Sequence, residues 1–362
     1  MKALITSGGH GTRLRPITHT QNKHLIPIAN KPILHYALEY VRDAGITEVG
    51  IVTNGHWVNG KLVPLPEVPE ALGDGSRWGL HLTYIPQEAP LGLGHVVRIA
   101  RDFIGNEPFV FYLGDNMVVG GIRRFVEEFE RTQPDCLLTL ARVKDPERFG
   151  VPELDGDRIL RIEEKPRHPK SQYAVAGIYL YQPCIFEAVE NLTPSARNEY
   201  EISDAHQYLL DHGFRVSYVE ITGWWKDTGK PLDLLEANRL VLEHLEPTIE
   251  GEVDADSNLF GPVTVQRGAQ ILNSNIRGPA IIGEETVIQD SYIGPFTSIY
   301  HHCRVWRSEI EYSIVLENCQ ILDVAQRIEA SLLGKDVEIR RAHDKPRVHR
   351  FMLSDQSRVE IV

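Results

Sequence analysis

Short apolar runs alternate with stretches of helical periodicity over the first two thirds of the chain. Residues 49–53 and 109–113 are continuous apolar runs, as expected of strands buried on both faces of a parallel sheet. Residues 32–44 repeat apolar positions at helical spacing, begin with a proline and precede Gly45. Two further helices are predicted at residues 122–129 and 231–245. The alternation predicts an α/β fold, a mainly parallel sheet with helices on both faces.

The pattern changes near Pro247, where helical periodicity ends and aliphatic residues begin to recur every six positions. One row is Ile281, Val287, Ile293, Ile299 and Val305, and a second row is Ile276, Ile282 and Ile288. This period is typical of a β-helix built from hexapeptide repeats, with an irregular antiparallel region as the alternative. We expect Gly278, Gly283, Gly294 and Asn318 at its corners.

The two patterns divide the chain into three parts. We predict an α/β catalytic domain over residues 1–246 and a β-helix domain over residues 247–341. Residues 342–362 form a tail, for which we predict a hairpin around Ser354–Ser357. Ligands of such a parallel sheet bind at the carboxyl ends of the strands, so the loops there are the candidate site.

A glycine-rich loop follows the first predicted strand. It contains Gly8, Gly9 and Gly11, followed by Arg13. Glycines let backbone N–H groups approach a polyphosphate, and arginine adds charge-assisted donors. The loop matches neither the dinucleotide fingerprint nor the P-loop, and the alternative is a simple turn between strand and helix. Lys23 follows closely, either as a solvated lysine or as a second cation of the same anion site.

Two acids are candidates for binding a metal. Asp115 follows the buried run 109–113 after one glycine, and Asp227 lies in the sequence Trp225-Lys226-Asp227-Thr228-Gly229. An aspartate in such a place also caps turns. However, two carboxylates beside a phosphate loop suit Mg²⁺, which completes its shell with phosphate oxygens and water.

Two other loops carry cations. Lys165 lies in Glu163-Glu164-Lys165-Pro166, and Arg197 lies in the loop 194–199. Runs of charge are usually solvated surface, but Lys165 has the reach to contact a second anionic substrate.

Composition narrows the function classes. The formal net charge is -12, which argues against a general binder of nucleic acid or anionic membranes. The sequence has no stretch for a signal peptide or a membrane span, so we expect a cytoplasmic protein. The four cysteines are far apart and form no C-x-x-C pair. This spacing suits a reducing compartment and argues against a disulfide framework or a zinc site.

Together these segments resemble the sugar-1-phosphate nucleotidyltransferases, and within them the long-form glucose-1-phosphate thymidylyltransferases. The resemblance runs from Lys2 to about Arg340. It is carried by the glycine loop, Lys23, the two aspartate segments, the Glu-Glu-Lys-Pro loop and the segments 72–75, 86–87 and 173–177. It implies a Rossmann-like nucleotidyltransferase domain followed by a left-handed β-helix. His10, Asn22 and His24 depart from the family pattern beside the expected triphosphate site.

The resemblance also implies residue roles. Gly8, Gly9, Gly11 and Arg13 would hold the triphosphate, with Lys23 at the reacting phosphate. Gln87 and Gly92 would contact the pyrimidine, and Asp115 and Asp227 would hold Mg²⁺. Gly150, Glu164 and Val175 would contact the sugar, while Lys165 and Arg197 would bind its phosphate.

The expected reaction joins glucose 1-phosphate to dTTP and releases pyrophosphate and dTDP-glucose, for activated sugar biosynthesis. One alternative is a uridylyltransferase that uses UTP, and another is a non-catalytic regulatory subunit that binds sugar nucleotides. A bifunctional enzyme with an acyltransferase β-helix would need a longer helix. We expect a homo-oligomer whose β-helix serves assembly.

Overall fold

The computed structural model describes residues 1–342 and 349–361. Contacts divide the chain into two compact units. The first unit is formed by Met1–His10 and Ile33–Asp227, and the second by Gly11–Pro32 and Thr228–Val362. The division differs from the predicted boundary at residue 246, because the segment 11–32 and the helix that precedes the β-helix both contact the β-helix coils.

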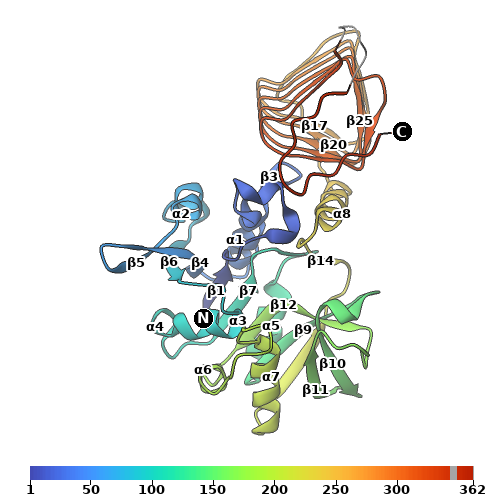
Figure 1. Ribbon diagram of the computed structural model, residues 1–362. Coiled ribbons are helices and arrows are strands. Elements are labelled where there is room, and N and C mark those ends of the chain that lie inside the picture. Colours follow the sequence, from blue (N-terminus) through green and yellow to red (C-terminus); the bar gives the residue numbers. More distant parts are fainter. Residues whose placement is uncertain (343–348, 362) are drawn as a thin grey trace. The chain divides into compact units, whose positions relative to one another are not determined.

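The first unit is built around an eight-stranded mixed sheet (Figure 1). Its strands lie in the order β13 (Val216–Glu220), β9 (Cys136–Arg142), β12 (Tyr173–Tyr181), β7 (Phe109–Leu113), β1 (Lys2–Thr6), β4 (Glu48–Val58) and β5 (Lys61–Pro64), with β6 (His81–Gln87) also paired to β4. The pairs β1–β4, β1–β7, β4–β6 and β13–β9 are parallel. Strand β12 runs antiparallel to both β7 and β9. The predicted α/β fold is confirmed, with an antiparallel strand inside the sheet.

Helices pack against this sheet in two groups. The first group, in mutual contact, contains α3 (Leu93–Ile99), α6 (Ile185–Glu190) and α7 (Ile202–Asp211), with the short α4 (Arg101–Ile104) beside α3. They share one core with Leu4, Phe109 and Phe111, alternate residues of β1 and β7. The second group is α1 (Ile33–Asp43) and α5 (Arg123–Thr132). Burial on both faces explains why β1 and β7 read as continuous apolar runs. The short helix α2 (Glu67–Leu72) lies between β5 and β6 in sequence.

Two small antiparallel sheets complete the first unit. One pairs β10 (Gly150–Asp155) with β11 (Arg158–Glu164), and the other pairs β8 (Asn116–Val118) with β14 (Trp225–Asp227). Both lie in segments that follow large-sheet strands along the chain, so they carry the predicted site loops.

The second unit contains helix α8 (Pro231–Leu242), the short strands β2 (Pro27–Ile28) and β3 (Lys31–Pro32), and a β-helix. Figure 1 shows the β-helix strands stacked in parallel layers. The first parallel sheet contains β15 (Glu252–Val253), β18 (Gln270–Leu272), β21 (Val287–Gln289), β24 (Arg304–Trp306), β27 (Gln320–Leu322) and β30 (Glu338–Arg340). The second contains β16 (Asn258–Phe260), β19 (Asn275–Arg277), β22 (Tyr292–Ile293), β25 (Glu309–Glu311) and β28 (Ile328–Glu329). The third contains β17 (Val263–Val265), β20 (Ala280–Ile282), β23 (Thr297–Ile299), β26 (Ile314–Val315) and β29 (Leu332–Leu333).

The interior of the β-helix corrects the predicted six-residue rows. Ile288 and Val305 are register partners and both lie in the core. Between them the interior stack continues through Ile293 and Ile299, so the step after Ile288 is five residues rather than six. The two predicted rows therefore join into one stack. Ile281 and Val287 lie one residue away from it in strands β20 and β21.

All four predicted corner residues lie in the bends between strands of different β-helix sheets: Gly278 between β19 and β20, Gly283 between β20 and β21, Gly294 between β22 and β23, and Asn318 between β26 and β27. Asn318 has a left-handed φ of 60°, as predicted, and Asn273, Asp290 and Asp323 have similar values. Small polar residues tolerate this conformation better than most. At Gly278, Gly283 and Gly294 the corner requires glycine for space, because a Cβ there would collide with a neighbouring coil, for example 2.0 Å from the Pro262 carbonyl oxygen at Gly278.

The hairpin predicted for the tail includes residues before 349 and after 361 that lie outside the described part of the chain. Within residues 349–361, the Ser357 N–H donates to the Ser354 carbonyl oxygen at 3.3 Å, which closes a turn. No strand forms within these thirteen described positions. In the described ranges 1–342 and 349–361, none of the helices has the length and apolar character to cross a bilayer.

Candidate active site

The first part of the glycine loop is held by a side chain from the neighbouring strand. The Gly9 N–H donates to Asn54 Oδ1 at 2.9 Å, and Asn54 Nδ2 donates back to the Gly9 carbonyl oxygen at 3.2 Å. A Cβ on Gly8 would lie only 3.2 Å from the same Asn54 oxygen. Gly9 has a φ of 95°, which L residues rarely adopt. Sequence reasoning missed Asn54, although it directly follows the apolar run 49–53.

Gln87, the predicted base-contacting residue, is itself held by a histidine. Gln87 ends strand β6 and is buried, and its Nε2 donates to His95 Nδ1 at 3.0 Å. The His95 ring stacks on Tyr200, with ring centroids 6.3 Å apart. Burial, and then the nearby Arg98 guanidinium, lower the pKa of His95, with a smaller opposing contribution from Glu88. A neutral His95 presents the lone pair that the Gln87 amide requires.

Backbone geometry places Gly92 beside Tyr200, the residue on which His95 stacks. It precedes helix α3 with a φ of 94°, and a Cβ there would lie 2.7 Å from backbone atoms of Tyr200. The Tyr200 N–H donates to the Leu91 carbonyl oxygen at 2.8 Å, so this loop runs against the segment that carries Arg197. Any larger residue at position 92 would separate the two segments.

The two candidate metal-binding acids lie at the ends of two paired strands: Asp115 directly precedes β8, and Asp227 ends β14. In the β8–β14 pair, Asp227 is the register partner of Asn116, which directly follows Asp115. Asn116 is buried, and its Nδ2 donates to Asp115 Oδ1 at 3.0 Å. Its Oδ1 accepts from Trp225 Nε1 at 2.7 Å and from the Gly177 N–H at 3.1 Å. Asn116 thus orders both aspartate-bearing segments, which the sequence did not reveal.

This arrangement fits a hard cation that takes few protein ligands. Among residues 1–342 and 349–361, the structure contains no group of three or more His, Cys, Asp or Glu side chains suited to hold a metal. The two carboxylates would supply oxygen ligands, and the remaining ligands would come from phosphate and water. The donor set therefore suits Mg²⁺ better than a metal that needs a closed cage of protein ligands.

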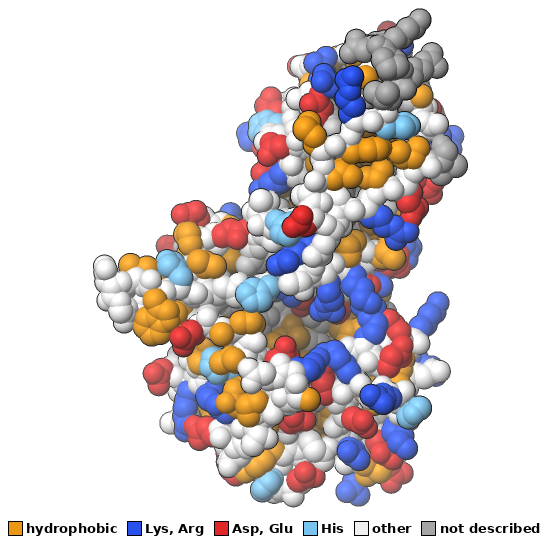
Figure 2. Space-filling view, in the orientation of Figure 1, with side chains coloured by type: hydrophobic (Ala, Val, Ile, Leu, Met, Phe, Trp, Pro, Cys, Tyr) orange, Lys and Arg blue, Asp and Glu red, His pale blue; other side chains and the backbone are white. Residues whose placement is uncertain are grey.

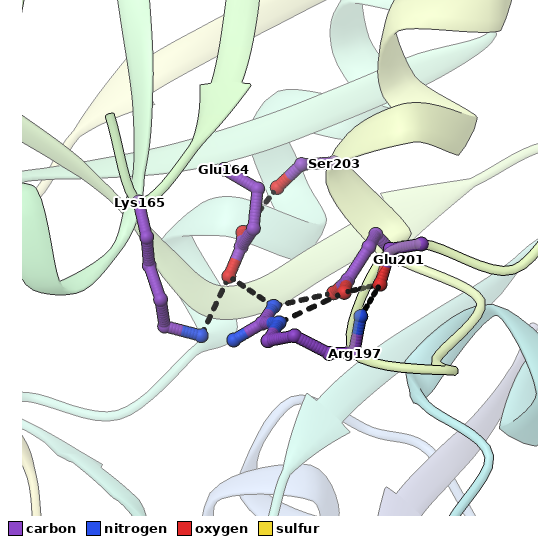
Figure 3. A network of polar contacts seen from close by, with 6 residues as sticks. Glu164, Lys165, Arg197, Glu201 and Ser203 are labelled. Atoms are coloured by element: carbon purple, nitrogen blue, oxygen red, sulfur yellow. Dashed lines mark hydrogen bonds and ion pairs between the residues drawn. The ribbon is translucent and has the colours of Figure 1, made fainter. Parts of the chain in front are cut away.

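Glu164 is the centre of a network of polar contacts in the candidate site (Figure 3). Its Oε1 accepts from Lys165 Nζ at 2.7 Å and from Arg197 Nη2 at 3.3 Å, and its Oε2 accepts from Ser203 Oγ at 2.7 Å. Arg197 also pairs with Glu201, at 2.8 Å from Nη2 to Oε2. Two cations from distant loops thus converge on one carboxylate.

Electrostatics explain the ionised state of Glu164. Burial alone would raise the pKa of its carboxyl, but the Lys165 ammonium, the Ser203 hydroxyl and the Arg197 guanidinium outweigh burial and lower the pKa. Both cations are exposed, so an incoming anion can reach them from solvent.

Gly150 and Val175 adjoin this network. A Cβ on Gly150 would lie 2.7 Å from Ser203 Oγ, 3.5 Å from Glu164 Oε2 and 3.7 Å from Val175 Cβ. Strand pairing places Gly150 opposite Glu164. The structure therefore brings together all five residues predicted to contact the sugar phosphate, together with Ser203 and Glu201, which were not predicted.

The remaining predicted phosphate-binding residues lie in the second unit. Gly11 has a φ of 57°, and its carbonyl oxygen accepts from Thr18 Oγ1 at 2.7 Å. Arg13 is exposed in the 3-10 turn that follows. Lys23 begins another such turn, capped by Asn22, whose Oδ1 accepts from the His24 N–H at 2.9 Å. His24 is buried and also contacts Asn22 through Nδ1, so these two departures from the family pattern form one local pair.

Comparison with known proteins agrees with this geometry. The model of the nucleotidyl transferase family matches residues 2–244. A glucose-1-phosphate thymidylyltransferase of Streptomyces griseus is 51% identical over 362 residues, covering 100% of this chain and 99% of the relative. A low-salt glycan biosynthesis nucleotidyltransferase of Haloferax volcanii is 41% identical and covers 100% of both chains.

Solved structures show the same similarity. A chain from Bacillus anthracis assigned as a glucose-1-phosphate thymidylyltransferase, in complex with sucrose, matches with a TM-score of 0.61 and 40% identity. The match covers 66% of this chain and 94% of that chain. A UDP-glucose pyrophosphorylase complexed with UDP-glucose matches with a TM-score of 0.57 and 25% identity, over 67% and 98% of the chains. Members of the family use a divalent metal. By its family model, its full-length relatives and its fold, the chain belongs to the nucleotidyl transferase family.

Proposed function

We propose that the protein transfers the thymidylyl group of dTTP to glucose 1-phosphate, giving dTDP-glucose and pyrophosphate. The observation that carries the proposal is the pair of cations on Glu164, because Lys165 and Arg197 come from two loops and leave their charge accessible. An anionic sugar phosphate would find two donors there, with Gly150 and Val175 beside its ring. The 51% identity to a glucose-1-phosphate thymidylyltransferase supports the same assignment over the full chain.

The proposed reaction is a direct displacement at the α-phosphorus of dTTP. An oxygen of the sugar phosphate forms the new O–P bond while the bond to the β-phosphate bridging oxygen breaks, and pyrophosphate leaves with the electron pair. Both substrates are anions, so catalysis rests on positioning and charge neutralisation. No covalent enzyme intermediate is required.

Each group of residues has one role in this proposal. Gly8, Gly9 and Gly11 offer backbone room and N–H groups to the triphosphate, Arg13 binds it, and Lys23 follows the reacting phosphate. Gln87 and Gly92 contact the pyrimidine edge. Glu164 orients Lys165 and Arg197 towards the sugar phosphate. Asp115 and Asp227 would hold Mg²⁺, which when bound neutralises charge on the phosphates.

We also propose that the protein works in the cytoplasm as a homo-oligomer. The four cysteines, at positions 136, 184, 303 and 319, are free, which suits a reducing compartment. The tail exposes large apolar side chains, among them Phe351, Met352 and Leu353. Figure 2 shows hydrophobic side chains gathered over part of the second unit, as at surfaces that bind another protein.

Initial rates of pyrophosphate release test the nucleotide assignment. dTTP, UTP, ATP and GTP are compared at equal low concentration with glucose 1-phosphate. We expect dTTP to react fastest and UTP measurably, since one methyl group contributes only about 1–3 kcal/mol of discrimination. Faster reaction with UTP would favour the uridylyltransferase alternative, which the similarity to a UDP-glucose pyrophosphorylase also keeps open. Faster reaction with a purine nucleotide would contradict the role of Gln87.

A further inference from the structure

The segment 11–32 carries three of the proposed nucleotide-binding residues but has little structure of its own. It contains Gly11, Arg13 and Lys23. Its only regular elements are three short 3-10 turns and the two-residue strands β2 and β3. Such a segment needs contacts from elsewhere to keep its charged side chains in one arrangement. The structure places it in the same compact unit as the β-helix.

The turn between β2 and β3 is held from outside. Ala29 and Asn30 have left-handed φ values of 46° and 57°, the arrangement of a tight hairpin turn. Alanine rarely adopts this conformation. The Ala29 N–H donates to Asn238 Oδ1 at 2.8 Å, and Asn30 Nδ2 donates to the Ile299 carbonyl oxygen at 2.7 Å. These bonds fix the turn against helix α8 and against a β-helix coil.

Asn238 connects all three elements. It lies on α8 and is completely buried. Besides the bond from Ala29, its Oδ1 accepts from Ser298 Oγ at 2.7 Å, and its Nδ2 donates to the Phe296 carbonyl oxygen at 3.1 Å. A buried amide costs stability unless it is fully hydrogen-bonded, and an asparagine disfavours a helix interior. Asn238 makes one hydrogen bond to the β2–β3 turn and two to the β-helix coil, and these three bonds connect both elements to α8.

The segment 11–32 also lies near the β-helix on the other side of Lys23 in sequence. A Cβ added to Gly334 would lie 3.8 Å from Ile17 Cγ1, so Ile17 is close to this coil. The segment therefore lies beside the β-helix both before and after Lys23, and the hydrogen bonds of Asn30 and Asn238 hold it there.

We infer that Asn238 is a positioning residue for nucleotide binding, through which the β-helix holds the segment 11–32 in the arrangement that binds the triphosphate. This inference rests on the proposed function, because it uses the proposed roles of Arg13 and Lys23. It gives the β-helix a part in substrate binding in addition to assembly. Asn30, on the β2–β3 turn, strengthens the contact with the β-helix through its bond to the Ile299 carbonyl oxygen.

Two variants of the full-length chain test the inference. Asn238→Ala removes the connecting amide. Asn30→Gly removes one bond to the coil but keeps a residue that tolerates a positive φ. We expect Asn238→Ala to raise the KM and Kd for dTTP by about tenfold, and Asn30→Gly by about threefold, as loss of a few hydrogen bonds would do. The KM for glucose 1-phosphate should change less than about twofold in both.

A matched control separates positioning from loss of stability. Ser291 is buried in the β-helix, where its Oγ donates to the Gln289 carbonyl oxygen at 2.7 Å and accepts from the Ser308 N–H at 3.2 Å. Ser291→Ala should lower the melting temperature and leave both KM values unchanged. If Asn238→Ala does not fold, the KM and Kd values of Asn30→Gly alone decide whether the inference holds.

The outcomes distinguish this inference from the proposed function. Wild-type KM and Kd for dTTP in the folded variants would overturn the inference, and so would an equal rise in both KM values. In either case the proposed function would stand, provided that the wild-type protein forms dTDP-glucose. If the wild-type protein neither binds dTTP nor forms that product, the proposed function itself is wrong.

Discussion

Lys165 lies at the candidate sugar-phosphate site, in contact with Glu164. The lysine is exposed, with a left-handed φ of 46°, and its Nζ lies 2.7 Å from Glu164 Oε1. We expect Lys165→Ala to raise the KM for glucose 1-phosphate by about tenfold and the KM for dTTP by much less. Steady-state kinetics with each substrate varied in turn measures both. Lys170→Ala, at an exposed lysine of the same loop, is the control. A larger effect on dTTP would mean that the two anion sites are interchanged.

The Gln87–His95 pair predicts a pH dependence of nucleotide binding. The neutral ring accepts the Gln87 amide proton at Nδ1, whereas the protonated ring would place a second donor there. Burial and Arg98 lower the pKa of His95. Binding should therefore be intact at neutral pH and weaken only as pH falls through that lowered pKa, below the range usual for histidine. The measurement is the KM for dTTP against pH, in the wild type and in His95→Gln, which keeps a hydrogen-bond acceptor. An identical acid limb in both proteins would contradict the role of His95.

At the residue scale, the sequence alone predicts charged and glycine positions for the site but not the residues that hydrogen-bond to them. Lys165 and Arg197 lie in recognisable loops, and Glu164 ends strand β11. Asn54, His95, Asn116 and Ser203 were missed, because each acts by a hydrogen bond to a residue in another element. An isolated asparagine or serine carries no local signal for such a contact.

At the scale of elements, the pairing of β8 with β14 places Asp227 opposite Asn116, the residue that directly follows Asp115. Asp227→Asn keeps the size of the side chain and the strand pairing but removes one charge. We expect turnover to fall by about two orders of magnitude or more, since a bound metal contributes several kcal/mol of charge stabilisation. Turnover is measured across a range of Mg²⁺ concentrations, with circular dichroism as a check of the fold. Normal Mg²⁺-dependent turnover would remove Asp227 from the metal site.

Elements were predicted best where one period persists. Helix α1 was predicted over residues 32–44 and spans Ile33–Asp43, and β7 spans the predicted run 109–113. The β-helix was also predicted, but its register was split into two rows because the step from Ile288 to Ile293 interrupts the six-residue period. The antiparallel placement of β12 was not foreseen, because its pairing is decided by strands distant in sequence.

At the scale of the whole molecule, we expect the β-helix to have two roles. It supports assembly, and it holds the segment 11–32 in place. A chain that ends at Glu246 loses the coil atoms that bond Asn30 and Asn238, and it exposes the apolar surface that those coils cover. We expect it to be less soluble, or to assemble differently from the full chain of 41.0 kDa. Light scattering coupled to size exclusion measures the mass of each. A monodisperse truncated chain with the native oligomeric state would contradict the assembly role.

The central claim is the joining of dTTP to glucose 1-phosphate, and phosphorus NMR of one reaction mixture tests it most directly. The full-length protein is incubated with both substrates and Mg²⁺, and the spectrum is followed over time. We predict that dTDP-glucose and pyrophosphate appear together in equal amounts while both substrates disappear, and that nothing forms without glucose 1-phosphate. Formation of dTDP or dTMP without a sugar nucleotide, or an unchanged spectrum, would contradict the account.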